Sequence, residues 1–589
     1  MRSFPILLAI SFGLPLNLYP LSDFPKDFLG IVVFSIFSLA IIWKYAPKIY
    51  SSTGVFAILL LCLSFLLTAF QGEESLAGPY FQAYLIFFFA ILLILVAVPT
   101  LIENTNREMV SLILIKGIFY SGVIVSFVAL LRYYGILKLF LPWVALDGDR
   151  LAGPWGQANL TALILALSVL TAIYYLQTIS GFRKVGVYLL VILFLFCAVL
   201  TGSRSWYLFL IVGFLVPAFY YVKAGYSNLS KRPQISSYLK KYVTILLIFA
   251  FVKIVAPTVD DSIGQRMKEL GLLERASAGA MLAARANLAS PERFSEWQKS
   301  LQNLEYMDSL AFGHGLGRYG NFSFSVEAEK NPVASSNNLW SHPHNLLILA
   351  LIEWGLVGLL ALIFVLVYIA YHFVKSEYSL TNTLMFSIAG IVLAQNMVEF
   401  SFWYFPFLAI FVFCVSTFLP RIHLGVKDRW LPRLVCGLFF IVFLPTGLRS
   451  AIDYYSLVSI FNSSEMNSNE AHSLELIKLS PLIGHAAYKV DIVKSRPSFA
   501  SAEREFSEIS GLMDLRPEPV FVMRHAVLSS VVLDEDSSCD LLRVTAREFP
   551  FTLDTALDDL GYLAEAGADI DVTFFSFCLL QGMAERESD

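Results

Sequence analysis

Residues 341–360 read SHPHNLLILALIEWGLVGLL, in which two histidines stand directly before a long apolar stretch. Pro343 disfavours a helical conformation at His342, and its fixed φ suits the first position of a helix. A helix that begins here carries Glu353 about ten residues in, roughly 15 Å along its axis. An acidic residue at that depth in an apolar helix usually faces a protein interior or a water-filled cavity. The stretch therefore predicts a polar site at the mouth of a long apolar helix.

The spacing of the polar residues is compatible with a shared site. His342 and Glu353 are eleven positions apart, close to three helical turns, so the two side chains can share one face. Histidine changes its charge near neutral pH, which suits a group that takes up and releases protons. The alternative is that these residues are simply solvated at the end of a helix, and the spacing alone leaves both interpretations open.

The composition is that of a membrane protein. Of the 589 residues, 57% are apolar and 15% are charged, and the mean hydropathy is +0.67. Apolar runs of nearly twenty residues recur along the chain, which is the length needed to cross about 30 Å of hydrocarbon. The net charge of −4 argues against a nucleic-acid partner. The first apolar run begins at Phe4 and lacks a small-residue cleavage site, so no cleavable signal is expected.

The apolar runs predict an all-α polytopic membrane protein with about 13 transmembrane helices. The expected spans are residues 4–20, 27–44, 53–70, 80–99, 108–131, 158–177, 185–201, 205–222, 242–256, 345–371, 382–400, 403–420 and 433–447. Loops rich in lysine and arginine all fall on one side of this alternating topology, so that side is expected to be the cytoplasm, together with the N-terminus.

This orientation divides the chain into four expected regions, two of which lie outside, in the periplasm of a Gram-negative cell. They are N-terminal transmembrane helices over 1–256, a large periplasmic loop over 257–344, C-terminal transmembrane helices over 345–447, and a periplasmic helical domain over 448–589.

Both outer regions are expected to be folded. Residues 262–288 have apolar positions near helical spacing and predict an interfacial amphipathic helix, and Ser290-Pro291 resembles the start of another helix. The tail suggests a small helical-repeat-like domain, with helical segments expected at 469–479, 500–513, 537–547 and 554–567. Its acidic residues near the C-terminus favour a solvated face over a metal site. Cys539 and Cys578 could pair if the tail faces an oxidising compartment.

Three polar clusters are expected on the outer face besides the histidines, at residues 147–159, 201–205 and 396–404. Arg150 and Arg204 would suit a diphosphate, because a guanidinium fork can bind phosphate oxygens through two hydrogen bonds. The alternative is that such arginines only anchor their helices in the membrane interface.

Two further motifs are interpreted as turns. Asp147-Gly148-Asp149 resembles a pair of metal ligands, but two acids around a glycine are commoner in turns and no further acidic ligand follows nearby. The glycine-rich run at 313–317 lacks the strand–helix context of a nucleotide-binding loop.

Several stretches, taken in order, resemble motifs of the bacterial O-antigen ligase and polymerase superfamily, and most of all its protein O-linked oligosaccharyltransferase branch. These stretches are 153–159 (a Gly-rich Gln-x-Asn motif), 201–204 (a Gly-Ser-Arg turn), Arg293 with Trp297 and 313–317 (the lead into the catalytic loop), His344-Asn345 with Glu353 and Gly355 (a His-Asn motif), and 398–404 (a Val-Glu-aromatic stretch). Ser401 stands where the pattern of that branch has proline. The tail is also of the kind found in that branch.

The resemblance implies a glycosyltransferase that moves a preassembled oligosaccharide from an undecaprenyl-diphosphate carrier in the inner membrane to Ser or Thr hydroxyls of periplasmic proteins such as pilins. His344 aligns with the family's His-Asn motif and is the expected catalytic base. His342 is the second candidate, with three alternatives left open: it orients His344, it binds glycan, or it does neither. Arg204 and Arg150 are the expected diphosphate ligands. Supporting or glycan-binding roles are expected for Gln157, Asn159, Arg293, Asn345, Glu353, Glu399 and Tyr404. The scheme requires neither a metal ion nor a cofactor.

Two other functions compete with this one. The first is ligation of O-antigen to lipid A core, or polymerisation of its repeat units. The tail of about 140 residues and the 399–404 stretch favour a protein acceptor instead. The second is a lipid-linked glycan transporter, which should hold its polar residues near the bilayer midplane and show repeated halves. Here the polar residues are expected at one face, beside a large external loop, which suits surface chemistry better.

Overall fold

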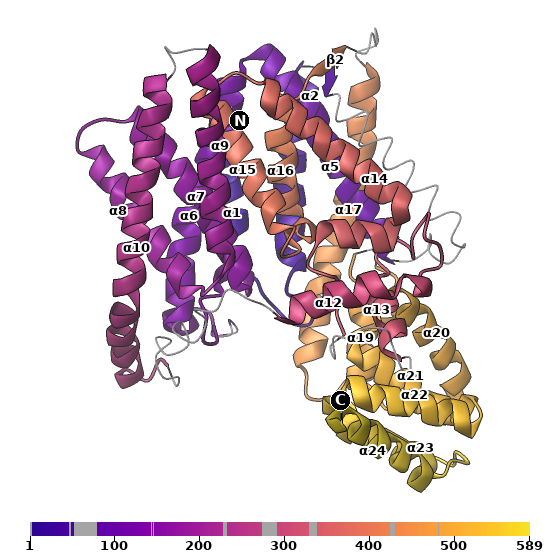
Figure 1. Ribbon diagram of the computed structural model, residues 1–589. Coiled ribbons are helices and arrows are strands. Elements are labelled where there is room, and N and C mark those ends of the chain that lie inside the picture. Colours follow the sequence, from indigo (N-terminus) through magenta and orange to yellow (C-terminus); the bar gives the residue numbers. More distant parts are fainter. Residues whose placement is uncertain are drawn as a thin grey trace. The chain divides into compact units, whose positions relative to one another are not determined.

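A computed structural model describes residues 3–45, 49–51, 79–142, 144, 147–227, 232–273, 291–328, 339–423, 430–480 and 482–588. These residues form 21 α-helices and several short 3-10 turns (Figure 1). The described part also contains one small antiparallel sheet, in which β1 (Ile49–Ser51) pairs with β2 (Arg421–His423). The predicted helical architecture is therefore confirmed, with this two-stranded pair added.

Eight described helices are long and apolar enough to cross a membrane, which makes the chain a multi-pass membrane protein. They are α2 (Phe24–Tyr45), α5 (Pro79–Asn104), α6 (Arg107–Tyr133), α7 (Ala158–Thr178), α8 (Arg183–Leu200), α9 (Ser205–Ser227), α10 (Arg232–Glu269) and α14 (Leu346–Lys375).

The other five expected spans form shorter helices, form part of a longer helix, or lie outside the described residues. Three of them form shorter apolar helices, namely α1 (Phe4–Gly13), α15 (Leu380–Gln395) and α16 (Phe405–Phe418). At about 1.5 Å per residue, helices of this length are shorter than a hydrocarbon core of about 30 Å. The expected span at 433–447 is part of the longer α17 (Trp430–Asn462), and the one at 53–70 lies outside the described residues.

The chain divides into two compact units, which are described separately. The membrane unit comprises Met1–Leu61, Leu85–Ala289 and Phe364–Gly447. The loop–tail unit comprises Cys62–Tyr84, Ser290–Ile363 and Leu448–Asp589. The division falls within α14 and within α17, so each of these helices contributes residues to both units.

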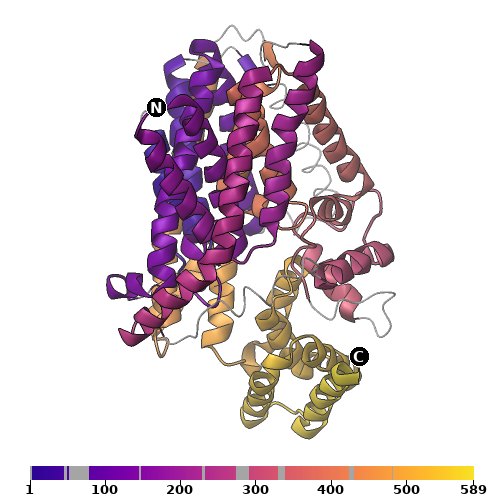
Figure 2. The ribbon, with the colours of Figure 1, turned by 60° about the vertical axis from the view of Figure 1, so that its left-hand side comes forward.

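In the membrane unit, α7 is the central helix, and almost all of its side chains are buried. It packs against α6, α8, α9 and α15, and Figure 1 shows α7 running beside α6. Figure 2 shows the same helices turned by 60°. A β-carbon added at Gly122 of α6 would lie 2.2 Å from Oγ of Ser168 on α7. Glycine at this contact therefore lets the two helices approach closely, as small residues do between membrane helices.

α10 extends further than the sequence predicts. It continues past Pro257 to Glu269, so residues 262–269 end this helix instead of beginning a separate one. Residues 270–273 are described and are not helical, which departs from the expected interfacial helix. Residues 274–290, with the remainder of that helix and the cap at Ser290, lie outside the described residues.

In the loop–tail unit, α12 (Pro291–Gln302), α13 (Tyr319–Ala328) and the first part of α14 surround a small apolar core. Tyr319 and Phe322 on α13 and Ile348 and Ile352 on α14 form its centre, and Trp297 of α12 packs against them. Pro291 is the first described residue of α12, a position that suits proline.

In the tail of the same unit, the described residues after α17 form seven short helices, four of which lie where the sequence predicts them. They are α18 (Ser468–Lys478), α19 (Gly484–Lys494), α20 (Ala502–Leu515), α21 (Pro519–Val532), α22 (Glu535–Glu548), α23 (Leu553–Glu565) and α24 (Val572–Ser588). Cys539 on α22 and Cys578 on α24 form a disulfide.

One acidic residue of the tail departs from the expected solvated face. Asp559 on α23 is buried and accepts a hydrogen bond from Arg496 at 3.2 Å. It also lies 3.6 Å from Nε of Arg524, whose side chain is buried among the tail helices and donates to the carbonyl groups of Ile492 and Ser495. A carboxylate between two guanidinium groups is a structural ion pair, which explains why this residue leaves the surface.

Candidate functional site

The histidine segment (residues 340–345) precedes α14, and the helix begins later than predicted. α14 starts at Leu346, and Asn345 caps it, because its side-chain oxygen accepts hydrogen bonds from the amides of Leu347 at 3.0 Å and Ile348 at 3.3 Å. Pro343 therefore lies outside the helix. His344, directly before the cap, has a φ of +52°, in the left-handed region that residues other than glycine rarely adopt.

A tryptophan on α12 fixes the backbone between the two histidines. The indole nitrogen of Trp297 donates a hydrogen bond of 2.7 Å to the carbonyl oxygen of Pro343. The ring of His344 meets the edge of Trp340, with ring centres 4.7 Å apart, and lies 4.0 Å from the ring of His342. The segment is thus held at its backbone and by ring contacts.

The two histidines differ in burial and in electrostatic surroundings. His342 is only 7% exposed, whereas His344 is half-buried. Burial lowers the pKa of His342 well below its usual range, and the nearby His344, Arg516 and Arg293 lower it further. His342 is consequently a neutral imidazole at neutral pH, beside a more accessible histidine.

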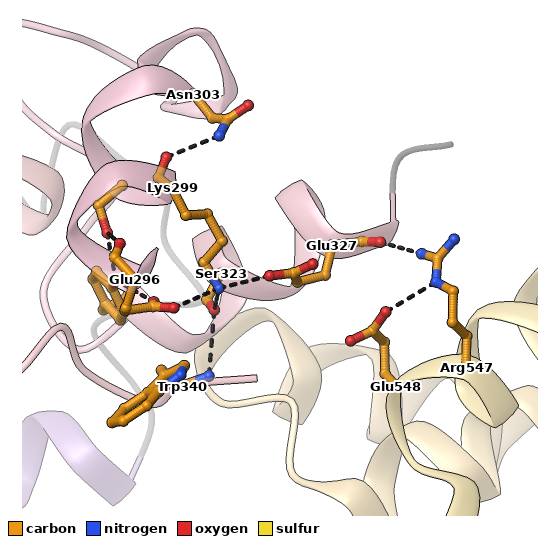
Figure 3. A network of polar contacts seen from close by, with 10 residues as sticks. Glu296, Lys299, Asn303, Ser323, Glu327, Trp340, Arg547 and Glu548 are labelled. Atoms are coloured by element: carbon orange, nitrogen blue, oxygen red, sulfur yellow. Dashed lines mark hydrogen bonds and ion pairs between the residues drawn. The ribbon is translucent and has the colours of Figure 1, made fainter. Parts of the chain in front are cut away.

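A buried ionic network holds α12 and α13 together next to this segment (Figure 3). The ammonium group of Lys299 lies 2.8 Å from a carboxylate oxygen of Glu296 and 3.0 Å from one of Glu327, and all three side chains are almost inaccessible. Lys299 also donates to Oγ of Ser323, which accepts from the amide of Trp340 at 3.4 Å. Because an unpaired buried charge is costly, this network fixes α12 and α13. α12 carries Trp297, and α13 carries Ser323, which accepts from the amide of Trp340.

Glu353 lies in α14 close to a break in that helix. Gly355 has non-helical angles (φ 65°, ψ −167°), and the backbone of residues 310–315 runs alongside the break. The amides of His314 and Gly315 donate to the carbonyl groups of Ile352 and Glu353 at 2.7 and 3.1 Å. A β-carbon on Gly313 would lie 2.3 Å from the carbonyl oxygen of Glu353, so the glycines at 313 and 355 permit the close approach.

The Glu353 side chain points to the start of α13. The carboxylate is buried and accepts a hydrogen bond of 3.4 Å from the amide of Tyr319, the first residue of that helix. A carboxylate stabilises a helix N-terminus, because the free amides and the helix dipole are positive there. His342 is not on a helix, so the shared helical face expected for it and Glu353 does not exist.

In the membrane unit, the structure brings together the three other polar clusters that the sequence predicts. Arg150 donates through Nε to the carbonyl oxygen of Thr201 at 2.7 Å and through Nη2 to Oδ1 of Asn159 at 3.0 Å. The amide of Asn159 in turn donates to Oε1 of the buried Glu399 at 2.5 Å. One chain of contacts thus links the 147–159, 201–205 and 396–404 stretches.

Asp147 holds a turn beside these contacts. It lies 2.9 Å from Nε of the buried Arg132 and accepts hydrogen bonds from the amides of Ala152 and Gly153, each at 3.0 Å. This geometry agrees with the turn interpretation of the Asp-Gly-Asp motif. In the part of the chain that the structure describes, no three or more His, Cys, Asp or Glu residues are grouped as they would be around a metal ion.

The remaining predicted site residues of the membrane unit have different surroundings. Arg204 is exposed, directly before α9. Gln157 is the residue before α7 but makes no side-chain capping bond. The hydroxyl of Tyr404 is buried and donates to Oδ2 of Asp23 at 3.4 Å. Ser401 accepts a hydrogen bond of 2.8 Å from the amide of Asn396, which holds the turn where the family pattern has proline.

The predicted site residues thus form two groups in two units. The loop–tail unit brings together His342, His344 and Asn345, with Arg293 acting electrostatically on His342. The membrane unit joins Arg150, Asn159 and Glu399. The sequence does not predict the contacts of Trp297 and Arg516 with the histidine segment, or the ring contact of Trp340 with His344 within it. Of these residues, only Trp297 carried a signal, through its place near Arg293.

Comparison with known proteins gives one match. Residues 189–363 match the family model described as O-antigen ligase. No curated protein and no solved structure matches the chain. The matched range includes Arg204, the histidine segment and the break at Gly355, and it ends within α14. The chain therefore carries an O-antigen ligase family domain across residues 189–363 of a multi-pass membrane protein.

Proposed function

We propose that this protein transfers a preassembled oligosaccharide from an undecaprenyl-diphosphate carrier to Ser or Thr hydroxyls of periplasmic proteins such as pilins. The O-antigen ligase family domain implies transfer of a lipid-linked glycan. The protein acceptor and the location, in the inner membrane of a Gram-negative bacterium with the reaction in the periplasm, belong to the proposal. The basic loops expected on the cytoplasmic side support this location, and so does the Cys539–Cys578 disulfide, since disulfides persist in oxidising compartments.

In this proposal His344 is the catalytic base. The acceptor hydroxyl oxygen attacks the anomeric carbon, the bond from that carbon to the diphosphate oxygen breaks, and His344 takes the hydroxyl proton. Undecaprenyl diphosphate leaves with the bonding electrons. Two features support the choice of His344: it is the more accessible of the two histidines, and its ring is placed by contacts with Trp340 and His342. A histidine has a reference pKa close to the pH of the periplasm, as a general base requires.

The diphosphate is assigned to Arg204. An exposed guanidinium can offer two parallel donors to phosphate oxygens and offset the charge that develops on the leaving group. Arg150 is the second candidate. It is less exposed than Arg204, and its Nε and Nη2 donate to Thr201 and Asn159. No step of this scheme requires a metal ion or a cofactor.

One observation mainly supports a protein acceptor: the histidine segment and the helical tail belong to one compact unit. The side chain of Asn321 on α13 donates to the carbonyl oxygen of Met513 on α20 at 3.2 Å. Arg547 on α22 donates to the carbonyl oxygen of Glu327 at the end of α13. A folded helical domain fixed beside the proposed base offers a surface for a protein substrate, which a lipid acceptor does not need.

The test uses purified full-length protein, an undecaprenyl-diphosphate oligosaccharide, and two acceptors in parallel. One acceptor is a periplasmic pilin and the other is lipid A core without O-antigen. Intact-mass spectrometry should show the pilin gaining the mass of the whole glycan, at Ser or Thr. Transfer only to lipid A core would instead establish the O-antigen ligase alternative, and lengthening of the donor glycan would establish a polymerase. Movement of the donor between leaflets without transfer would establish a transporter.

A further inference from the structure

A short turn of the helical tail lies against the histidine segment. The turn consists of Arg516, Pro517 and Glu518, between α20 and α21. A β-carbon added at Gly320 on α13 would be 3.4 Å from Cδ of Pro517, 3.7 Å from Cα of Ser341 and 4.0 Å from Cγ of Arg516. The turn, α13 and the residue before His342 therefore meet at one point.

The turn is rigidly attached to the tail. Glu518 accepts a hydrogen bond from Lys489 at 2.7 Å and lies 3.3 Å from Nε2 of His485, both on α19. Nε of Arg516 lies 3.6 Å from the same carboxylate. Burial raises the pKa of Glu518, but the hydrogen bond with His485 and the charges of Arg516 and Lys489 outweigh it and lower the pKa, so the carboxylate stays ionised. The prolines at 517 and 519 limit the backbone further.

We propose that Arg516 is a positioning residue, supplied by the C-terminal tail, which places a cationic side chain next to His342 and thereby acts on the proposed base His344. The role of His344 rests on the proposed function, whereas the effect of Arg516 on His342 does not. The tail then acts directly on the histidine segment, in addition to offering an acceptor surface.

The electrostatic argument follows from the groups around His342. They are His344 on its own segment, Arg293 on α12 and Arg516 on the turn, and each of them disfavours a proton on His342. A neutral His342 can exchange a hydrogen bond or a proton with a neighbouring imidazole, whereas two cationic rings 4.0 Å apart would repel each other. Removing the charge of Arg516 should therefore raise the pKa of His342 and make the neutral form scarcer at acidic pH.

The test measures the titration of His342 directly. Exchange of the imidazole C2 hydrogen for deuterium depends on the charge of the ring, and mass spectrometry of fragment ions separates His342 from His344. Full-length protein in detergent is titrated as wild type, Arg516→Gln, Arg516→Lys and Arg504→Gln. Arg504 is the matched control, because it lies on α20, is largely exposed, and forms only a loose surface ion pair with Glu508, at 3.8 Å. No glycan is needed, so the result stands even if the proposed function fails.

Arg516→Gln should move the midpoint of His342 to higher pH, while Arg516→Lys and Arg504→Gln stay near wild type. In the transfer assay, the fall of kcat/KM towards acidic pH should begin at a higher pH in Arg516→Gln than in wild type, because protonation of His342 removes the neutral form. Coincident titrations of Arg516→Gln and Arg504→Gln would overturn the proposal. Equal shifts in Arg516→Gln and Arg516→Lys would also overturn it, since the effect would then come from packing and not from charge.

Discussion

The histidine segment of the loop–tail unit and the arginine cluster of the membrane unit (Arg132, Asp147, Arg150, Asn159 and Glu399) are held in different ways. In the arginine cluster, charged and amide side chains bond to one another and to backbone groups. In the histidine segment, the described hydrogen bonds involve the amide of Trp340, the carbonyl of Pro343 and the cap formed by Asn345, while the imidazoles make ring contacts. We expect the first arrangement mainly to stabilise the fold, and the proposed function assigns the chemistry to the second.

The largest expected effect is that of His344→Ala. If this residue is the base, transfer should fall about 100- to 10,000-fold, the usual contribution of general-base catalysis. His342→Ala should leave a measurable remainder, because it is proposed to orient and not to accept the proton. Initial rates on the glycan donor and a Ser-containing acceptor, at pH 5.5–8, measure both. The unfolding midpoints of the two variants should stay near wild type. If His342→Ala instead lost more activity than His344→Ala, His342 would be the base and His344 the orienting residue.

Asp147→Asn should show the opposite pattern. Arg132 is 8% exposed at its side chain, and its partner Asp147 is inaccessible, so the substitution leaves a buried cation without its counter-charge. The expected loss of stability is about 3 kcal/mol. Thermal unfolding in detergent measures it, and transfer per folded molecule should change far less than in His344→Ala. A stable but inactive Asp147→Asn protein would break the comparison, since it would place chemistry in the arginine cluster.

The sequence predicts the elements of the fold better than the contacts between them. Hydropathy locates the long apolar helices, because crossing a bilayer requires about twenty apolar residues in sequence. The sequence does not predict the break at Gly355, because its cause is the backbone near Gly313, which is distant in sequence. For the same reason, the sequence does not predict the hydrogen bond from Trp297 to Pro343 or the position of Arg516 near the histidine segment. The histidines and Arg204 become candidates from the sequence because local motifs carry them, and their roles stay predictions. Asn345, a candidate on the same ground, is a helix cap in the structure.

Arg204→Lys distinguishes an exposed arginine that binds substrate from one that only anchors a helix. Lysine keeps the charge but cannot offer two parallel donors, so donor use should fall at least about tenfold if the guanidinium binds the diphosphate as a fork. The KM for the lipid-linked donor and the amount of folded protein in membranes are measured together. Unchanged turnover, with normal abundance, would remove Arg204 from the proposed mechanism and leave the anchoring role.

Trp297→Phe is expected to give the smallest effect and the sharpest view of how the histidine segment is held. Phenylalanine keeps an aromatic ring in the core around Tyr319 but cannot donate to the carbonyl of Pro343. One lost hydrogen bond is worth about 1 kcal/mol, which corresponds to about fivefold in rate if the bond serves to place the histidines. The loss should appear in kcat with KM nearly unchanged, because the reacting groups and not the substrate are displaced. Arg504→Gln, on the exposed face of α20, serves as the control for general perturbation. If Trp297→Phe lowers the unfolding midpoint and leaves kcat intact, the bond is only part of the scaffold, and the histidine segment is held no differently from the arginine cluster.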